Sequence, residues 1–231
     1  VLGCAKAFTL LPGVRRAALA SVVPRQTEHP GQDSFALLLD VGATVHCEAD
    51  ELVQFALMGA SYARRISKLP SPRVGLLNMG SEENKGGEVL TLTYRRLQAL
   101  TGLHFVGNVE GHELVRGKAD VIVCDGFTGN VVLKLLEGLS ETLGEVTRAA
   151  GEQKLLWRVG LRLLSQGIER VRALSDYTQY GGSPILGFRQ LFLKCHGRSN
   201  ATAITNAVKV AAKGVRDRVP AEIADAITTV R

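Results

Sequence analysis

Short apolar runs alternate with helix-length segments along most of the chain, and this alternation is the strongest constraint on its fold. Residues 35–41 form an almost unbroken apolar run, which is typical of a strand buried on both faces of a sheet. The same reasoning predicts strands at 73–78, 104–106, 120–124 and 191–195, and helices at 51–68, 88–100, from about 129 onward, and at 200–213. This order predicts an α/β fold, in which a mostly parallel sheet carries helices on both faces.

The length of 231 residues suits one large domain, and a hydrophobic fraction of 45% supplies enough apolar residues for a packed core. We therefore expect one α/β domain over residues 1–231. The four cysteines, Cys4, Cys47, Cys124 and Cys195, are far apart in the sequence, and no pair has the spacing of metal ligands. This spacing predicts reduced thiols in a cytoplasmic protein, with neither a metal site nor disulfides.

The net charge of +6 favours an acidic partner, which could be nucleic acid, anionic lipid or an acidic protein. Aromatic residues make up 5% of the chain and are not interleaved with the basic ones, so we expect no nucleic-acid partner. No apolar run is long enough to cross a bilayer.

A basic amphipathic segment at about 148–178 interrupts the alternation of strands and helices. Lys154, Arg158 and Arg162 lie among bulky apolar residues, which predicts a helical excursion from the domain. An amphipathic helix of this kind binds anionic membranes in peripheral proteins. In other proteins its apolar face packs against its own domain, a second subunit or an acidic protein. The candidate membrane-contact residues are Leu155, Leu156, Trp157, Val159 and Leu163.

Polar, glycine-rich loops follow four of the predicted strands, at residues 78–88, 107–111, 125–130 and 196–200. Glycine lets a backbone come close to a ligand, and the exposed amides at the start of the next helix favour an anion. Each loop alone is also a common tight connection. Because ligands of parallel α/β sheets bind beyond the carboxyl ends of the strands, four such loops together predict a phosphate site.

None of the common phosphate-binding or nucleophile motifs occurs in the sequence. It contains no Walker-type lysine loop, no convincing dinucleotide fingerprint and no nucleophile elbow. The loops offer Asn, Lys, Glu, Asp and His side chains, which suit orientation and charge stabilisation better than covalent catalysis.

The loops resemble those of the bacterial PlsX-type phosphate acyltransferase family, over about residues 14–212, in family order and at family spacing. The matching motifs are Leu39-Asp40-Val41-Gly42-Ala43, Arg73-Val74-Gly75-Leu76-Leu77-Asn78 with Gly80 and Glu82, Phe105-Val106-Gly107-Asn108-Val109-Glu110, Asp125-Gly126-Phe127-Thr128-Gly129-Asn130, Asp176-Tyr177 with Tyr180-Gly181-Gly182, and His196-Gly197-Arg198-Ser199. The resemblance implies a fold like those of isocitrate and isopropylmalate dehydrogenases and of phosphotransacetylase. The family's amino-terminal strand and its first two glycine-rich motifs have no counterpart here, so we expect this chain alone to be weakly active or inactive.

The resemblance implies transfer of a long-chain acyl group from acyl carrier protein to inorganic phosphate for phospholipid synthesis, by a homodimer that needs no cofactor. Lys85 and Asn130 occupy the family's catalytic positions: Lys85 as the cation for phosphate and developing charge, Asn130 as the donor that orients carbonyl or phosphate. The implied substrate-binding residues are Asn78, Gly80, Glu82, Gly107, Asn108, Glu110, Asp125, Gly126, Gly129, Tyr180, Gly181, His196, Gly197 and Ser199.

Simpler roles compete with these assignments. Lys85 alone would be interpreted as a solvated surface charge, Asn130 as a helix-start residue, and His196 as a satisfied histidine at a strand end. The alternative enzymes are a short-chain phosphotransacetylase that uses coenzyme A and a metal- and nicotinamide-dependent hydroxyacid dehydrogenase. The dehydrogenase would need an arginine cluster and paired aspartates, which we do not find. A non-enzymatic basic module that binds membrane or nucleic acid would leave the four loops unexplained.

Overall fold

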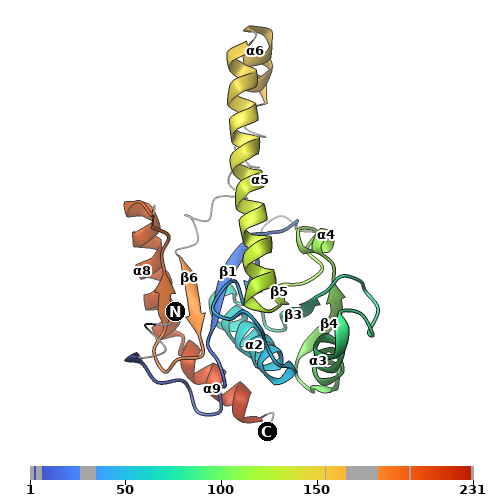
Figure 1. Cartoon of the computed structure of the whole chain (residues 1–231). Helices are drawn as coiled ribbons and strands as arrows, with labels where there is room; N and C mark the ends of the chain where they lie inside the picture. The colour runs from blue at the N-terminus through green and yellow to red at the C-terminus, as the bar shows by residue number, and fades with distance from the viewer. Residues whose placement is uncertain are drawn as a thin grey trace.

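The computed structural model describes residues 3, 7–26, 35–153, 155–164, 182–197 and 199–229, and shows an α/β fold with a projecting helix pair (Figure 1). The described residues form a seven-stranded sheet in the order β4-β3-β5-β2-β1-β6-β7. The strands are β1 (Ala18–Pro24), β2 (Phe35–Leu39), β3 (Arg73–Leu77), β4 (His104–Val109), β5 (Val121–Val123), β6 (Ser183–Leu186) and β7 (Phe192–Lys194).

The sheet is parallel in one half and antiparallel in the other. Strands β4, β3, β5 and β2 are parallel neighbours, whereas β1, β6 and β7 each pair antiparallel with the strand before them in the sheet order. The predicted α/β class is confirmed. Strands β1 and β6 are absent from the sequence-based prediction, because the alanine-containing β1 and the proline-containing β6 carry weak strand signals.

The direction of β7 corrects one expectation about the site. Lys194 at the end of β7 pairs with Ser183 at the start of β6, and β6 runs in the same direction as the parallel strands. The loop at 196–200 therefore leaves the sheet at the edge opposite to the other three glycine-rich loops. The prediction that all four loops share one edge is wrong, because it treated β7 as another parallel strand.

The predicted helices are present, with boundaries shifted by a few residues, and α9 lies beyond the last predicted one. The helices are α2 (Ala49–Tyr62), α3 (Gly87–Ala99), α4 (Gly111–Leu114), α5 (Gly126–Gln153), α6 (Leu155–Leu163), α8 (Ala201–Arg216) and α9 (Val219–Thr229), with a π-helical turn η1 (Ala63–Ser67) after α2. In the part of the chain that the structure describes, no helix combines the length and hydrophobicity needed to cross a membrane.

Two apolar cores lie on opposite faces of the sheet. Leu39 of β2 faces the core that includes Phe55 of α2 and Ile223 of α9. The adjacent Leu38 faces the other core, which Leu136 of α5 covers. Because successive side chains of a strand point to opposite faces, β2 is apolar throughout and buried on both sides, as its sequence predicts.

Helix α5 begins against the sheet and continues well beyond it, and α6 packs beside its far end (Figure 1). Its 28 residues correspond to a length of about 42 Å. The projection therefore starts before residue 148, the predicted beginning of the excursion, and residues 165–178 of that predicted segment lie outside the described residues.

A buried ion cluster lies at the amino-terminal edge of the parallel strands. Asp120 pairs with Arg25 and accepts hydrogen bonds from the Arg73 backbone at 2.7 Å and from its Nη2 at 3.0 Å. Burial acts to raise the pKa of Asp120, but the hydrogen bonds from Arg73 and the charges of both arginines outweigh it and lower the pKa below its usual value. Asp120 thus pairs with two arginines that it joins across the sheet, and we assign the cluster to stability.

Candidate active site

The loop that follows β2 is organised by the buried carboxyl group of Asp40. Its oxygens accept hydrogen bonds from the backbone N–H groups of Gly42 at 3.1 Å, Ala43 at 2.9 Å and Thr44 at 2.8 Å, and from the Thr44 hydroxyl at 2.8 Å. The N–H of Leu19, on the neighbouring strand β1, donates to the same carboxyl group at 3.0 Å. Hydrogen bonds to a carboxylate are stronger than those between neutral groups, so residues 40–44 are held in one conformation.

Helix α5 starts in direct contact with this loop. A Cβ atom at Gly129 would collide with the carbonyl oxygen of Asp40, and a Cβ at Gly126 would collide with that of Thr44. Both positions therefore require glycine for the close approach of helix and loop. This packing explains two of the predicted substrate-binding glycines without a ligand.

The close approach positions Asn130 at the carboxyl edge of the sheet. Asp125 caps α5 by accepting a hydrogen bond from the N–H of Thr128 at 2.8 Å. Asn130 lies one turn further along, exposed, with its Oδ1 within 3.5 Å of where a Cβ of Gly42 would be. Since Asp125 performs the capping, the side chain of Asn130 is not needed for that role.

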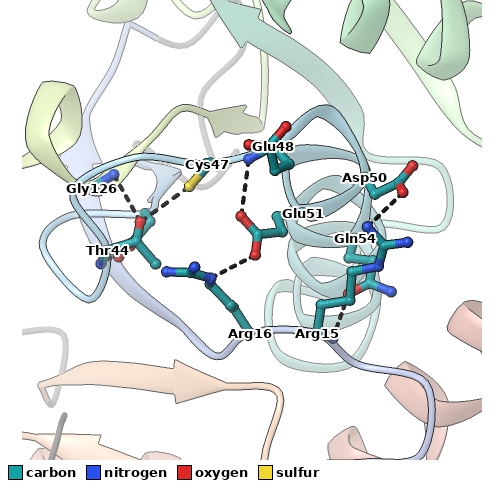
Figure 2. Close-up of polar contacts among 10 residues, drawn as sticks. Arg15, Arg16, Thr44, Cys47, Glu48, Asp50, Glu51, Gln54 and Gly126 are labelled. Atoms are coloured by element: carbon teal, nitrogen blue, oxygen red, sulfur yellow. Dashed lines mark hydrogen bonds and ion pairs between the residues drawn. The ribbon is translucent and has the colours of Figure 1, made fainter.

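Thr44 links the loop to the start of α2, as Figure 2 shows. Its Oγ1 accepts a hydrogen bond from the N–H of Gly126 at 3.3 Å and lies 3.1 Å from the sulfur of Cys47. Burial raises the pKa of Cys47 to about 11, against the opposing effect of the Thr44 hydrogen bond. Cys47 is therefore a neutral thiol near pH 7 and a poor nucleophile.

Two arginine side chains near the start of α2 form ion pairs that hold the fold together. Arg16 pairs with the buried Glu51 at 2.5 Å, and Arg15 pairs with Asp50 at 2.6 Å (Figure 2). Glu51 also accepts a hydrogen bond from the N–H of Glu48 at 2.9 Å, which completes a capping box at the start of α2. These contacts fasten the segment before β1 to α2.

Two asparagine side chains from neighbouring strands hold the loop that carries Lys85. Asn78 donates from Nδ2 to the Lys85 carbonyl at 3.0 Å and accepts from the N–H of Met79 at 2.8 Å. Asn108 of β4 donates from Nδ2 to the Glu82 carbonyl at 2.7 Å. The loop is thus tied to β3 and β4 at its backbone, whereas Lys85 itself is exposed.

Glycines allow the sharp turns of this loop. Gly86 has a φ of +86°, and a Cβ there would come within 2.6 Å of Asn78 Oδ1. A Cβ at Gly80 would come within 2.8 Å of Glu82 Oε2 and 3.1 Å of Lys85 Cγ. The side chains of Glu82 and Lys85 therefore lie together over Gly80.

One buried acceptor in this group has no partner among the described residues. Asn108 is almost fully buried, and its Oδ1 makes no hydrogen bond there. The neighbouring residue Gly107 has a φ of +86°, a conformation that favours glycine. Glu110, the next predicted site residue, begins α4 in a capping box with Glu113.

A cavity of about 340 Å³ lies between α5 and the antiparallel half of the sheet. Asn130 is the first α5 residue that lines it. His196 and Ser199 line it from the loop between β7 and α8, so the cavity connects residues from opposite edges of the sheet. Gly197, in the same loop, is exposed.

The structure thus sorts most of the predicted site residues into two groups. The first surrounds Lys85 and contains Asn78, Gly80, Glu82, Gly107 and Asn108. The second surrounds Asn130 and contains Asp125, Gly126 and Gly129, with His196 and Ser199 across the cavity. Because β3 and β5 are adjacent, the loops bearing Lys85 and Asn130 leave neighbouring strand ends. Tyr180 and Gly181 lie outside the described residues, and their roles stay predictions.

The site prediction omitted Asp40 and Thr44, on which the second group depends. A signal was present in the sequence, because Asp40 is the single charged residue of an apolar strand run and is followed by glycine at 42. Lys134, which lines the cavity one turn after Asn130, was also omitted.

The fold and these loops define an α/β protein with glycine-rich loops at the carboxyl edge of its parallel strands and a cavity beside the helix that follows. Residues 3–222 match the profile of the family described as "Fatty acid synthesis protein". The chain belongs to this family, and its resemblance to PlsX-type phosphate acyltransferases is confirmed.

Curated relatives share about two fifths of the aligned residues. A phosphate acyltransferase of Nitratidesulfovibrio vulgaris is 42% identical over 217 residues, which are 94% of this chain and 61% of the relative. A phosphate acyltransferase of Desulforudis audaxviator is 43% identical over 219 residues, which are 95% of this chain and 63% of the relative. The chain therefore spans less than two thirds of the length of these relatives.

A solved structure confirms the fold class. The crystal structure of a phosphotransacetylase from Streptococcus pyogenes matches with a TM-score of 0.56 and 16% sequence identity, over 90% of this chain and 57% of that chain. At this identity the likeness concerns the fold alone, which agrees with the phosphotransacetylase-like architecture expected from the sequence.

Proposed function

We propose that this chain provides the Lys85 and Asn130 loops of an enzyme that transfers a long-chain acyl group from acyl carrier protein to inorganic phosphate. Its membership of the fatty acid synthesis family supports this function, as do relatives named phosphate acyltransferases. The products are an acyl phosphate and the free thiol of acyl carrier protein, and the acyl phosphate is a precursor for phospholipid synthesis.

The reaction requires positioning and charge stabilisation more than proton removal. A phosphate oxygen attacks the thioester carbonyl carbon, an oxyanion forms on the carbonyl oxygen, and the C–S bond then breaks to release the thiolate. Phosphate is already anionic near neutral pH, so the main barrier is to bring it to the carbonyl and to stabilise the oxyanion. Cationic and amide donors that are in place beforehand meet this requirement.

In the proposed mechanism, Lys85 and Asn130 supply these two kinds of donor. The ammonium group of Lys85 attracts phosphate and stabilises the developing negative charge. The amide of Asn130 donates a hydrogen bond that orients the thioester carbonyl or the phosphate. Neither role involves a covalent intermediate, and the high pKa of the nearby Cys47 is consistent with a mechanism that needs no thiolate.

The observation that carries the proposal is the double attachment of the Lys85 loop. An exposed loop would ordinarily sample many conformations, but hydrogen bonds from Asn78 and Asn108 hold the carbonyl groups of Lys85 and Glu82. The backbone is therefore ordered while the lysine side chain stays accessible. This is the arrangement that electrostatic stabilisation of a transition state requires, because reorganisation of the donor is avoided.

The projecting helix pair supports a proposal of peripheral membrane contact. Leu156 is 79% exposed and Leu163 is 83% exposed, and Trp157 and Val159 of α6 are also exposed, whereas the side chain of Leu155 is outside the described set. An amphipathic helix with such a face binds anionic lipid reversibly, which would bring a reactive product to the membrane. Flotation with anionic vesicles tests this, and Leu156→Glu with Leu163→Glu should abolish it. Flotation of that double variant would contradict the proposal.

The homodimer also stays a proposal, and α5 offers a surface for it. Phe127, Val131 and Leu135 recur every four residues along the helix outside the cavity lining, and all are exposed. A stripe of this kind buries itself against another helix in many dimers. Light scattering of the purified protein would test the dimer, and a purely monomeric species would refute it.

The decisive experiment for the function supplies inorganic phosphate and long-chain acyl carrier protein and measures acyl phosphate. A full-length relative, such as that of Nitratidesulfovibrio vulgaris, serves as the positive control. Acetyl-coenzyme A replaces the acyl donor in a parallel reaction, because the fold is also that of a phosphotransacetylase. Turnover of acetyl-coenzyme A in preference to the long-chain donor would refute the proposed substrate.

A pair of variants at Asn130 then tests the mechanism. Asn130→Asp preserves the shape of the side chain but places a negative charge beside incoming phosphate, so it should reduce turnover at least as strongly as Asn130→Ala. Turnover of the aspartate variant equal to that of the parent would show that Asn130 takes no part in catalysis.

A further inference from the structure

The cavity beside α5 is a groove with an apolar floor. Leu133 and Leu136 on the inner side of α5 pack toward the sheet, where Leu19 and Val23 of β1 form the opposite wall. Leu139 and Leu143 continue the apolar surface toward the projecting part of the helix. The floor is therefore continuous from the sheet to the base of the helix pair.

The groove has the length of one fatty acyl chain. The lining residues of α5 run from Asn130 to Leu143, which corresponds to about 20 Å along a helix axis. The hydrocarbon core of a bilayer is about 30 Å thick and contains two leaflets, so one lipid chain spans about 15 Å. A chain that starts at Asn130 would thus reach the far end of the groove.

The rims of the groove are polar, in contrast to its floor. On the α5 side, Lys134 pairs with Glu137 at 2.6 Å. On the other side, His196 and Ser199 line the groove. An apolar floor between polar rims suits a linear amphiphile that lies lengthwise in the groove. The floor then covers the methylene groups of the ligand, and the rims of the groove stay in contact with water.

We propose that this groove holds the acyl chain of the thioester substrate, with the carbonyl end at Asn130 and the methyl end toward Leu143. The inference rests on the proposed function. It adds where the acyl chain of the substrate lies and which residues limit the length of that acyl chain. The bulk of the side chain at position 139, about two thirds of the way from Asn130 to Leu143, then limits the length of the acyl chain that the groove accepts.

The test compares two leucines that lie one turn apart on α5 and are equally accessible. Leu139 is 58% exposed and lines the groove, whereas Leu135 is 60% exposed and does not line it. Binding of palmitate and octanoate is measured for the parent, Leu139→Trp and Leu135→Trp by displacement of a fluorescent fatty acid. Both substitutions are at exposed sites, and circular dichroism confirms that each variant is folded.

We expect Leu139→Trp to weaken palmitate binding by about tenfold or more, because each methylene left in water costs roughly fourfold in affinity. Octanoate binding should stay close to that of the parent, and Leu135→Trp should bind both acids normally. Equal effects of the two substitutions, or parent-like palmitate binding by Leu139→Trp, would overturn the proposal. Loss of self-association in Leu139→Trp with unchanged palmitate binding would assign the groove to a second copy of the chain and would also overturn it.

These outcomes are separable from the proposed function, because fatty acid binding requires no turnover. A protein that shows the expected binding pattern but transfers no acyl group to phosphate, even when the family's amino-terminal segment is restored to it, retains the groove and refutes the function. A protein that forms acyl phosphate with the same chain-length preference in the parent and in Leu139→Trp retains the function and refutes the groove.

Discussion

Two loops at the same edge of the sheet differ in how they are held and in how exposed they are. The loop at 40–44 surrounds the buried Asp40 carboxyl group, and its hydrogen bonds are made within the protein. The loop at 79–86 is exposed, and two asparagine side chains hold it from beneath. Both follow parallel strands, so their position in the fold does not explain the difference.

The difference lies in which group each loop presents. The first loop presents its backbone to α5, and the glycines at 126 and 129 let that helix begin close enough to place Asn130. The second loop presents the side chain of Lys85 to solvent. We infer that the first is a scaffold, whose loss affects stability, and that the second is a functional loop, whose loss affects turnover.

The largest effect should come from Asp40→Asn. The substitution replaces an acceptor oxygen by an NH₂ group among backbone N–H donors, so we expect the free energy of unfolding to fall by about 3 kcal/mol or more. Urea denaturation followed by circular dichroism measures this. Asp125→Asn, at a partly exposed helix cap that tolerates asparagine, is the control and should cost less than about 1 kcal/mol. Equal stability of the two variants would abolish the distinction between scaffold and functional loop.

Lys85→Ala should show the reverse pattern. We expect turnover with phosphate to fall by about a hundredfold, which is roughly 2.7 kcal/mol of transition-state stabilisation, while the unfolding transition is unchanged. The exposed Lys209 of α8 offers a matched control, since Lys209→Ala removes the same charge at a distant surface. Similar turnover in both variants would remove Lys85 from the mechanism.

Asn108→Ala should have an intermediate effect on both turnover and stability. Loss of the hydrogen bond to the Glu82 carbonyl frees the Lys85 loop, so turnover should fall by about tenfold and stability by about 1 kcal/mol. Ionised Asn108→Asp cannot donate this bond and also buries an unpaired charge, so it should reduce turnover alike and lose more stability than Asn108→Ala. If kcat were normal in both variants, the loop would not depend on its attachment to β4.

The smallest effect is expected for Thr44→Val. It removes the hydroxyl that donates to Asp40 and accepts from the Gly126 N–H at 3.3 Å, but it keeps the backbone N–H bond to Asp40. The expected cost is about 1 kcal/mol of stability. Turnover at a temperature well below the unfolding transition should equal that of the parent. A large loss of turnover in the folded variant would show that the scaffold loop takes part in the chemistry.

Much of the parallel half of the fold is predictable from local sequence. The apolar run at 35–41 and the valine- and isoleucine-rich run at 120–124 indicate strands buried on both faces, and the structure confirms them as β2 and β5. The glycine-rich loop of Lys85 is also evident. What local sequence does not show is that Asn78 and Asn108 hold this loop, because the two residues lie 30 positions apart and meet only when β3 and β4 pair.

The sequence by itself therefore determined the α/β class and the glycine-rich loops, and family resemblance added the prediction that Lys85 and Asn130 are catalytic. Only the tertiary structure decided the direction of β7, the insertion of β1 beside β2, the role of Asp40 and the groove beside α5. The physical reason is that side chains alternate in the same way in parallel and antiparallel strands, so periodicity carries no information about strand direction. Pairing depends on contacts between distant segments, and the cavity that joins Asn130 to His196 exists only after those segments have packed.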